Sequence, residues 1–96
     1  MSQRRSKLEI RLKILAAIRD GQDKPTRIMY AANLSWKPTQ RILAQLIEQE
    51  LVSEHRNTES AKSRRRYQIT DKGITVIEYF EKAKELLPIE EVYTSK

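Results

Sequence analysis

The chain has 96 residues, with 19 Lys and Arg against 13 Asp and Glu, and a formal net charge of +6. It contains no cysteine, one histidine and two glycines that lie far apart, which excludes disulfides, thiolate metal sites and a glycine-rich phosphate loop. No apolar run reaches the roughly 18 residues of a membrane span, and no apolar segment of a signal peptide follows the basic N-terminus. We therefore expect one small cytoplasmic domain.

The positive charge is concentrated in the first two thirds of the chain. Residues 1–70 hold 15 Lys and Arg against 7 Asp and Glu, a balance of +8, whereas residues 71–96 hold 4 against 6, a balance of −2. This asymmetry indicates a part that binds a polyanion, joined to a part with another task. The alternative is that the basic surface only aids solubility.

Three helices are predicted in the first half of the chain. Apolar residues at helical spacing predict the first over residues 6–20, with Gly21 as a left-handed stop. Pro25 suits the first position of a second, short helix over residues 25–32, with Asn33 as its stop. Ser35 is a good N-cap for a third helix over residues 36–50, although the proline at position 38 makes a later start the alternative.

The hydrophobic period changes after Leu51, where apolar and polar residues begin to alternate. Val52 opens one short strand, and Tyr67 and Ile69 lie on a second, with a polar loop between them. The pair predicts a β-hairpin with a long tip. Two helices joined by a short turn form a helix-turn-helix, and the hairpin that follows makes the unit winged.

A last helix is predicted over residues 71–87, ending before Pro88, and residues 89–96 are expected to form a flexible tail. Four of its apolar residues follow a 4-3-4 spacing, which is typical of a two-stranded helical seam. These are Val76, Phe80, Ala83 and Leu87. We expect residues 71–88 to pair two copies of the chain as a homodimer, the alternative being a single wide face packed within one monomer.

The third helix carries a set of polar and small residues opposite its apolar stripe. Arginine reads guanine and glutamine reads adenine in the major groove, and a small alanine permits close approach. The set consists of Lys37, Gln40, Arg41, Ala44 and Gln45. The alternative is an ordinary solvated helix face, because these residues are also good surface helix formers. Trp36 is expected to cover the core rather than touch DNA.

Basic residues also mark the hairpin, where they precede the second strand. An arginine fork can bind two phosphate oxygens at once, so the hairpin is predicted to lie along a duplex backbone. The residues assigned to this role are Lys62, Arg64, Arg65 and Arg66. The alternative is a solvated charge run. Arg4, Arg5 and Lys7 are either a further arm for DNA or part of a disordered terminus.

The segments Thr26–Leu34 ("TRIMYAANL") and Tyr67–Gly73 ("YQITDKG") closely resemble the archaeal winged-helix DNA-binding family, which includes small dimeric chromatin-associated proteins. The resemblance implies DNA binding as a dimer through Lys37, Gln40, Arg41 and the wing, with the C-terminal helix pairing antiparallel with its partner. In this chain Glu50 stands where the family commonly ends the recognition helix with glycine.

The sequence therefore predicts a mainly α (α+β) winged helix-turn-helix, with a DNA-binding domain over residues 6–70 and a C-terminal dimerisation helix. Its expected partners are double-stranded DNA and a second copy of itself, near the nucleoid, with no membrane, metal or cofactor. A transcription regulator and an architectural chromatin protein both fit. A winged helix that contacts other proteins is the rival, and an enzyme is disfavoured because no catalytic constellation is present.

Overall fold

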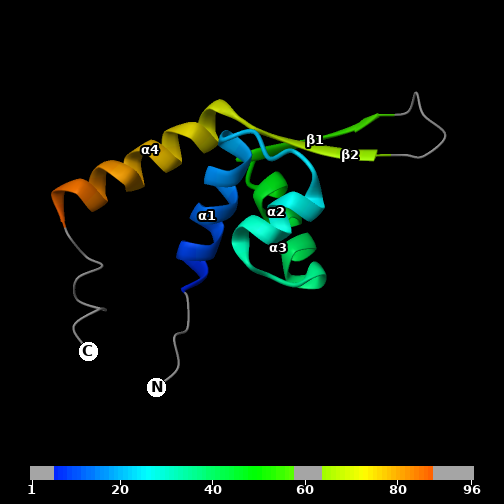
Figure 1. The fold of residues 1–96 in the computed structure, drawn as a ribbon. Coiled ribbons are helices and arrows are strands. Elements are labelled where there is room, and N and C mark those ends of the chain that lie inside the picture. Colours follow the sequence, from blue (N-terminus) through cyan, green and yellow to red (C-terminus); the bar gives the residue numbers. More distant parts are fainter. Residues whose placement is uncertain (1–5, 58–63, 88–96) are drawn as a thin grey trace, which may run out of the picture.

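The computed structural model describes residues 6–57 and 64–87, which form four helices and one hairpin (Figure 1). In chain order the elements are α1 (Lys7–Arg19), α2 (Pro25–Ala32), α3 (Trp36–Glu48), β1 (Val52–Asn57), β2 (Arg64–Ile69) and α4 (Asp71–Leu86). The order and type of every predicted element are confirmed, and with them the mainly α winged helix-turn-helix class. Arg4, Arg5, Lys62 and the tail over residues 89–96 lie outside the described residues.

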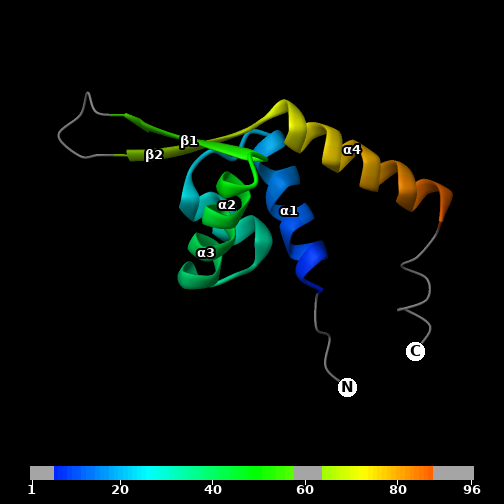
Figure 2. The same cartoon turned by 180° about the vertical axis from the view of Figure 1, so that it is seen from behind.

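Helices α1, α2 and α3 form the body, and the other two parts extend from it in opposite directions. The hairpin β1–β2 extends on one side and α4 on the other, in both the front and the rear view (Figures 1 and 2). The two strands are antiparallel, with Val52 opposite Ile69 and Glu54 opposite Tyr67. The molecule therefore presents a hairpin and a long helix as two separate projections from one core.

The core receives side chains from each of the six elements, which is why so short a chain can bury a connected apolar cluster. The largest contributions come from α1 and the helix-turn-helix. The buried cluster consists of Ile14, Leu15, Ile18, Ile28, Ala32, Leu43, Leu46, Val52, Tyr67 and Ile77. Tyr67 also fixes the hairpin through its backbone, because its N–H donates to the Asp23 carbonyl oxygen at 2.9 Å.

The helix ends largely follow the predicted signals. Ser6 and Glu9 form a reciprocal capping box at the start of α1. Asn33 ends α2 in the left-handed conformation, with φ of 55°, as its sequence position indicates. Ser35 is the N-cap of α3, which begins at Trp36, so the alternative start at Pro38 is wrong.

The end of α3 differs from the prediction, because the helix stops at Glu48 rather than continuing to residue 50. Glu50 adopts a left-handed φ of 65°, its N–H donates to the Ile47 carbonyl, and the Leu51 N–H donates to the Leu46 carbonyl. These two bonds form a Schellman termination of the kind that usually uses glycine. Glu50 thus takes the place of the glycine that the resemblance leads one to expect, at the cost of backbone strain.

Gly73 allows α4 to begin close against the base of the hairpin. A Cβ atom at this position would lie 2.3 Å from the Leu51 carbonyl oxygen and 2.7 Å from Cγ1 of Ile69. The preceding Thr70 caps the helix, with its hydroxyl accepting from the Gly73 N–H and donating to the Glu50 carbonyl oxygen. The ends of α3, β2 and the start of α4 therefore meet at one tightly packed junction.

The strain at Glu50 predicts that Glu50→Gly stabilises the protein. Glycine removes the cost of the left-handed conformation, so we expect the free energy of unfolding to rise by about 1 kcal/mol. Gln49→Gly is the matched control, because residue 49 has an ordinary φ of −82° and gains no such relief. Denaturant melts of both variants provide the comparison. If Glu50→Gly is as destabilising as Gln49→Gly, the left-handed termination of α3 is wrong.

Candidate nucleic-acid interface

One face of α3 is exposed along its whole length. Lys37, Arg41, Ala44 and Glu48 are all exposed, and they recur at the 4-3-4 spacing of one helical stripe. The opposite side is fixed by Leu43 and Leu46, which are fully buried. Of the five base-facing residues predicted from the sequence, Lys37, Arg41 and Ala44 thus share a face that a ligand can reach.

The two predicted glutamines are placed differently, because both are only partly exposed and both are held by arginines of the same chain. Nη1 of Arg65 on β2 donates to Oε1 of Gln40 at 3.3 Å. Nη2 of Arg11 on α1 donates to Oε1 of Gln45. In this structure their carboxamides therefore contact the protein on either side of α3, rather than projecting with Lys37 and Arg41.

The surroundings of the exposed face carry no negative charge over a long stretch of sequence. Between Lys24 and Ile47 there is no Asp or Glu, so α2, the turn and nearly all of α3 are free of carboxylates. Two aromatic side chains lie on the same stretch, Tyr30 with 77% of its surface exposed and Trp36 with 48%. Trp36 is expected from the sequence to cover the core, but with half of its surface exposed it covers the core only in part.

Arg65 and Arg66, adjacent on β2, lie on opposite faces of the hairpin, which keeps their charges apart. Side chains alternate along a strand, so Arg65 lies on the face of Tyr67 and Arg66 on the other. Nε of Arg65 lies 3.3 Å from Oε2 of Glu54, and Nε of Arg66 lies 3.8 Å from Oδ2 of Asp23. Each of these two positive charges thus has a carboxylate partner within the protein. The side chain of Arg64 is not described.

A shallow hollow lies where the hairpin passes the start of α2. Its lining consists of Lys24, Pro25, Thr26, Arg65 and Arg66, and its volume is about 230 Å³. The first N–H groups of a helix carry partial positive charge, and here three cationic side chains are added to them. The hollow therefore favours anions. It lies beside α3, because Arg65, which lines it, also donates to Gln40 of that helix.

Burial decides the state of the one phenol that supports the hairpin. Tyr67 is 2% exposed, and its removal from water raises the pKa of its hydroxyl, an effect that the neighbouring Arg65 partly opposes. Because its pKa is raised, the hydroxyl of Tyr67 stays neutral to a higher pH than an ordinary tyrosine, and it contributes no charge to the basic surface. The charge of this region comes from the lysines and arginines alone.

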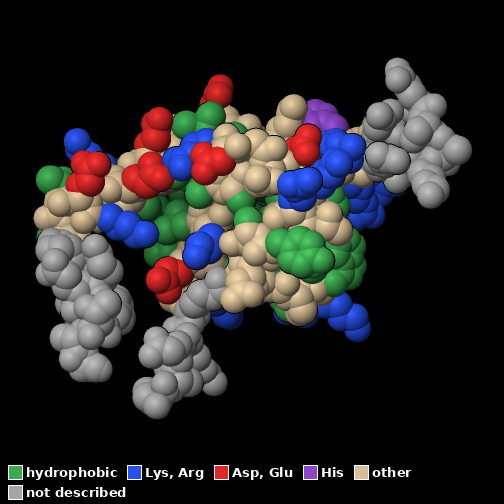
Figure 3. Space-filling model, in the orientation of Figure 1, with side chains coloured by type: hydrophobic (Ala, Val, Ile, Leu, Met, Phe, Trp, Pro, Cys, Tyr) green, Lys and Arg blue, Asp and Glu red, His purple; other side chains and the backbone are tan. Residues whose placement is uncertain are grey.

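The two projections of the molecule differ in charge. Lys and Arg side chains gather on the hairpin side of the view in Figure 3, and Asp and Glu side chains gather over α4. Helix α4 is tied to α1 by Nη1 of Arg19 and Oε2 of Glu81, 2.9 Å apart, and this bond is the main reason that the pKa of Arg19 is raised. The charge asymmetry predicted from the sequence thus corresponds to two different surfaces.

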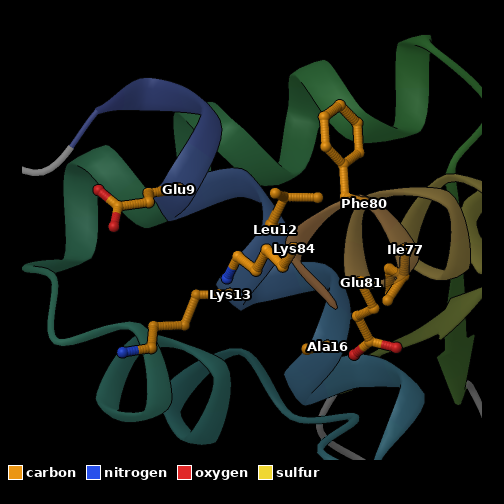
Figure 4. Close-up of a pocket in the computed structure, with 8 residues that line it drawn as sticks. All are labelled: Glu9, Leu12, Lys13, Ala16, Ile77, Phe80, Glu81 and Lys84. Carbon is orange, nitrogen blue, oxygen red and sulfur yellow. The ribbon is translucent and has the colours of Figure 1, made fainter. Parts of the chain in front are cut away.

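An apolar groove of about 280 Å³ runs between α1 and α4 (Figure 4). Leu12 and Ala16 of α1 face Ile77 and Phe80 of α4, and charged side chains surround them. The charged residues are Glu9, Lys13, Glu81 and Lys84.

Of the four residues predicted to form a helical seam, Leu87 is exposed and the other three are partly buried. Val76 packs against the monomer core, which means that only part of the predicted seam remains free. Tyr79 and Leu86, which the seam did not include, are 72% and 71% exposed.

Comparison with protein families gives a match over nearly the whole chain. A family described as winged helix-turn-helix matches residues 4–87, which includes the body, the hairpin and α4. The chain belongs to the winged helix-turn-helix family. A relative in Methanocaldococcus jannaschii, an uncharacterized protein, is 34% identical over 86 residues, which cover 90% of this chain and 37% of the relative. The chain thus spans well under half the length of that archaeal relative.

Solved structures with this winged helix-turn-helix fold include transcription regulators. A PadR family transcription regulator from Clostridium difficile superposes with a TM-score of 0.75 at 16% identity, covering 90% of this chain and 95% of the regulator. Streptococcus pneumoniae FabT, solved in complex with DNA, has a TM-score of 0.67 at 11% identity, covering 90% of this chain and 59% of FabT. At these sequence identities the likeness shows only that the fold is shared.

Residues 6–57 and 64–87 offer neither a membrane-spanning helix nor a cluster of metal ligands. No helix in this part of the chain is long and apolar enough to cross a membrane. The same residues contain no group of three or more His, Cys, Asp or Glu side chains placed to hold a metal ion. The exposed face of α3, with the hollow beside it, remains the leading candidate site.

Proposed function

We propose that this winged helix-turn-helix protein binds double-stranded DNA as a homodimer, with α3 as the recognition helix in the major groove. The observation that carries the proposal is the exposed stripe of Lys37, Arg41 and Ala44 within a stretch of sequence that has no carboxylate. An α-helix fits the width of the major groove, and a positive surface is attracted to the phosphates on both sides of it.

Within this interface Arg41 is the main candidate for reading a base. It is exposed near the middle of the helix, and its fork can bind O6 and N7 of guanine together. Ala44, one turn further on, is small enough to let the helix approach a thymine methyl group. Glu48, at the end of the same stripe, can accept a hydrogen bond from cytosine. Gln40 and Gln45 are assigned to holding α3 in place, since arginines occupy their oxygens.

The backbone contacts are assigned to the start of α2 and to the wing. Lys24 and Arg66 line the hollow beside the first turn of α2, where a phosphate gains from both the helix dipole and the side-chain charges. Arg27 is exposed on α2 and adds positive charge to this helix. The pair between Arg66 and Asp23 is long at 3.8 Å, so a phosphate can replace the carboxylate with little loss.

Between the two kinds of DNA-binding protein, we favour a transcription regulator. Regulators are frequent among the structural neighbours, and an exposed stripe with arginine, alanine and glutamate suits base readout. An architectural protein would need phosphate contacts alone. A regulator shows a large ratio of specific to non-specific affinity and an architectural protein a small one. In either role the protein acts on the genomic DNA of the cell.

The homodimer is assigned to α4, which presents more apolar surface than one monomer covers. Tyr79 in its middle and Leu86 and Leu87 at its end are exposed, while Phe80 and Ala83 are partly buried. In a two-fold dimer each copy contributes the same patch, so the end of one α4 can lie in the groove between α1 and α4 of the other. The apolar floor of that groove and its mixed charged rim suit such a helix end.

The base-reading assignment predicts that Arg41→Ala and Arg27→Ala have different effects. Losing a base contact should cost roughly 1–3 kcal/mol on the preferred sequence and relax the preference at one position. Losing a phosphate contact on α2 should weaken binding to all duplexes alike and lower the slope of log affinity against log salt by about 0.9. Binding titrations at several salt concentrations, with randomised-site selection, measure both quantities.

If the affinity of the parent chain for duplex DNA does not depend on salt, the assignment of phosphate contacts is wrong. The rival role, a winged helix that contacts proteins, is then favoured. If Arg41→Ala keeps the sequence preference of the parent chain, the protein reads the shape or backbone of DNA rather than a base through Arg41. The architectural role is then favoured. The two results are separate, because the first concerns whether DNA is the partner and the second how it is read.

The dimer assignment predicts that Leu87→Glu separates the two copies. Leu87 is 60% exposed in the monomer, so the substitution spares the core, whereas a carboxylate in an apolar contact between copies is costly. Lys82→Glu, on an exposed position of the same helix, is the control for the added charge. Analytical ultracentrifugation should show monomers for Leu87→Glu only, with weaker DNA binding because two linked contacts become one. A parent chain that is monomeric at tens of micromolar contradicts the assignment.

A further inference from the structure

Arg65 connects three elements of the protein at the place where the wing meets α3. Its Nη1 donates to Oε1 of Gln40 on α3 at 3.3 Å, and its Nε lies 3.3 Å from Oε2 of Glu54 on β1. Arg65 itself belongs to β2, so a single guanidinium joins both strands of the hairpin to α3. The two contacts use different edges of the planar group, which lysine cannot imitate with one ammonium.

The carboxamide that Arg65 holds is only partly covered, because the hydrogen bond between them lies at an exposed position. Nε2 of Gln40 is buried without a hydrogen-bond partner, while Oε1 accepts from Arg65. An amide whose nitrogen is buried and unsatisfied gains its one bond within the protein at the oxygen, and that bond orients the group. The contact between Arg65 and Gln40 is therefore expected to fix the side chain, and with it the angle between the wing and α3.

The charge of Arg65 is already balanced in the free protein. Arg56 on β1 is directly opposite Arg65 in the register. Glu54, two residues before Arg56, lies on the same face of the hairpin. Two arginines opposite each other repel, and Glu54 offsets this repulsion. A phosphate at Arg65 would have to displace both a carboxylate and a carboxamide, whereas the carboxylate pair of Arg66 is the long one with Asp23, beside a bond from its Nη1 to the backbone carbonyl oxygen of Arg65.

We propose that Arg65 is a positioning residue for base recognition: it holds Gln40, and through it the orientation of α3 against the wing, instead of serving as a phosphate ligand. The inference rests on the proposed function, because it concerns which bases the exposed face of α3 meets. It assigns different tasks to two adjacent arginines. Arg66 contacts the DNA backbone, and Arg65 sets the geometry in which Arg41 reads the groove.

The test removes the pair without changing the net charge of the protein. Arg65→Met combined with Glu54→Gln deletes both charged groups, keeps the length of the side chain at position 54 and leaves an unbranched apolar side chain at position 65. Arg66→Met with Asp23→Asn is the matched control on the other face of the same strand. Glu54→Gln alone is the second control, because it leaves the bond between Arg65 and Gln40 in place. Circular dichroism and thermal melts establish that each variant is folded.

Two quantities are then measured for duplex binding: the slope of log affinity against log salt, and the ratio of affinities for the preferred site and a site altered at the position read by Arg41. For the Arg65/Glu54 variant we expect an unchanged slope and a ratio reduced several-fold. For the Arg66/Asp23 variant we expect the slope to fall by about 0.9 with an unchanged ratio. Glu54→Gln alone should keep the ratio of the parent chain.

Gln40→Leu completes a double-mutant cycle. If Arg65 acts through Gln40, adding Gln40→Leu to the Arg65/Glu54 variant should reduce the ratio no further, since the interaction is already lost. Additive losses, a slope that falls by about 0.9 for the Arg65/Glu54 variant, or an unchanged ratio would each overturn the inference. A parent chain with no measurable base preference would also overturn it, because there would be no recognition to position.

A measurement without DNA separates this inference from the proposed function. The side-chain amide resonances of Gln40 in the free protein should shift strongly in the Arg65/Glu54 variant and hardly at all in the Arg66/Asp23 variant. Unmoved resonances mean that the contact does not exist in solution and overturn the inference at its first step. Failure of the parent chain to bind duplex in a salt-dependent way overturns the proposed function, whatever the resonances show.

Discussion

The arrangement of this protein depends on the burial of Tyr67 in the hairpin. Its side chain is 2% exposed in a core built mainly by α1, α2 and α3, and its N–H donates to the carbonyl oxygen of Asp23. These two contacts fix β2 on the helical body, so the direction of the wing is set by the core. Because side chains alternate along a strand, the same constraint places Arg65 toward α3 and Arg66 toward Asp23.

The constraint also explains why three adjacent arginines are compatible with a stable strand. Their repulsion is reduced by geometry, since neighbouring side chains leave the sheet on opposite faces, and by carboxylates that the fold brings to two of them. Glu54 comes from the paired strand and Asp23 from the segment before α2. Both pairs are partly exposed, so each contributes little to stability, and the long pair between Arg66 and Asp23 can be exchanged for a phosphate at small cost. A basic surface that is folded and still available to phosphate requires this balance.

Much of the fold could be predicted because local signals determine it. Pro25, Asn33 and Ser35 mark helix ends through their own backbone preferences, and the change from helical to alternating period marks the hairpin. The end of α3 was placed two residues too late because no glycine signals it; Glu50 adopts the left-handed conformation under the demand of the packed junction with Thr70 and Gly73. Tertiary packing there overrides the preference of the residue, which a local pattern cannot reveal.

The candidate site could be predicted only in part, for a related reason. Helical periodicity identifies the side of α3 that faces away from the core, and Lys37, Arg41 and Ala44 follow from it. Gln40 and Gln45 lie at the borders of that side, and their partners Arg65 and Arg11 are distant in sequence. Whether a border residue faces DNA or its own protein depends on those partners. Trp36 lies at a similar border, and its exposure follows from its position in the first turn of α3.

Methylation interference on a selected duplex tests the central claim, that α3 enters the major groove, most directly. Dimethyl sulfate modifies N7 of guanine, which lies in the major groove, and N3 of adenine, which lies in the minor groove. If Arg41 reads guanine from the major groove, methylation of one or two guanines should block binding, and the block should disappear in Arg41→Ala. Interference confined to adenines, or none at any base, would contradict the account.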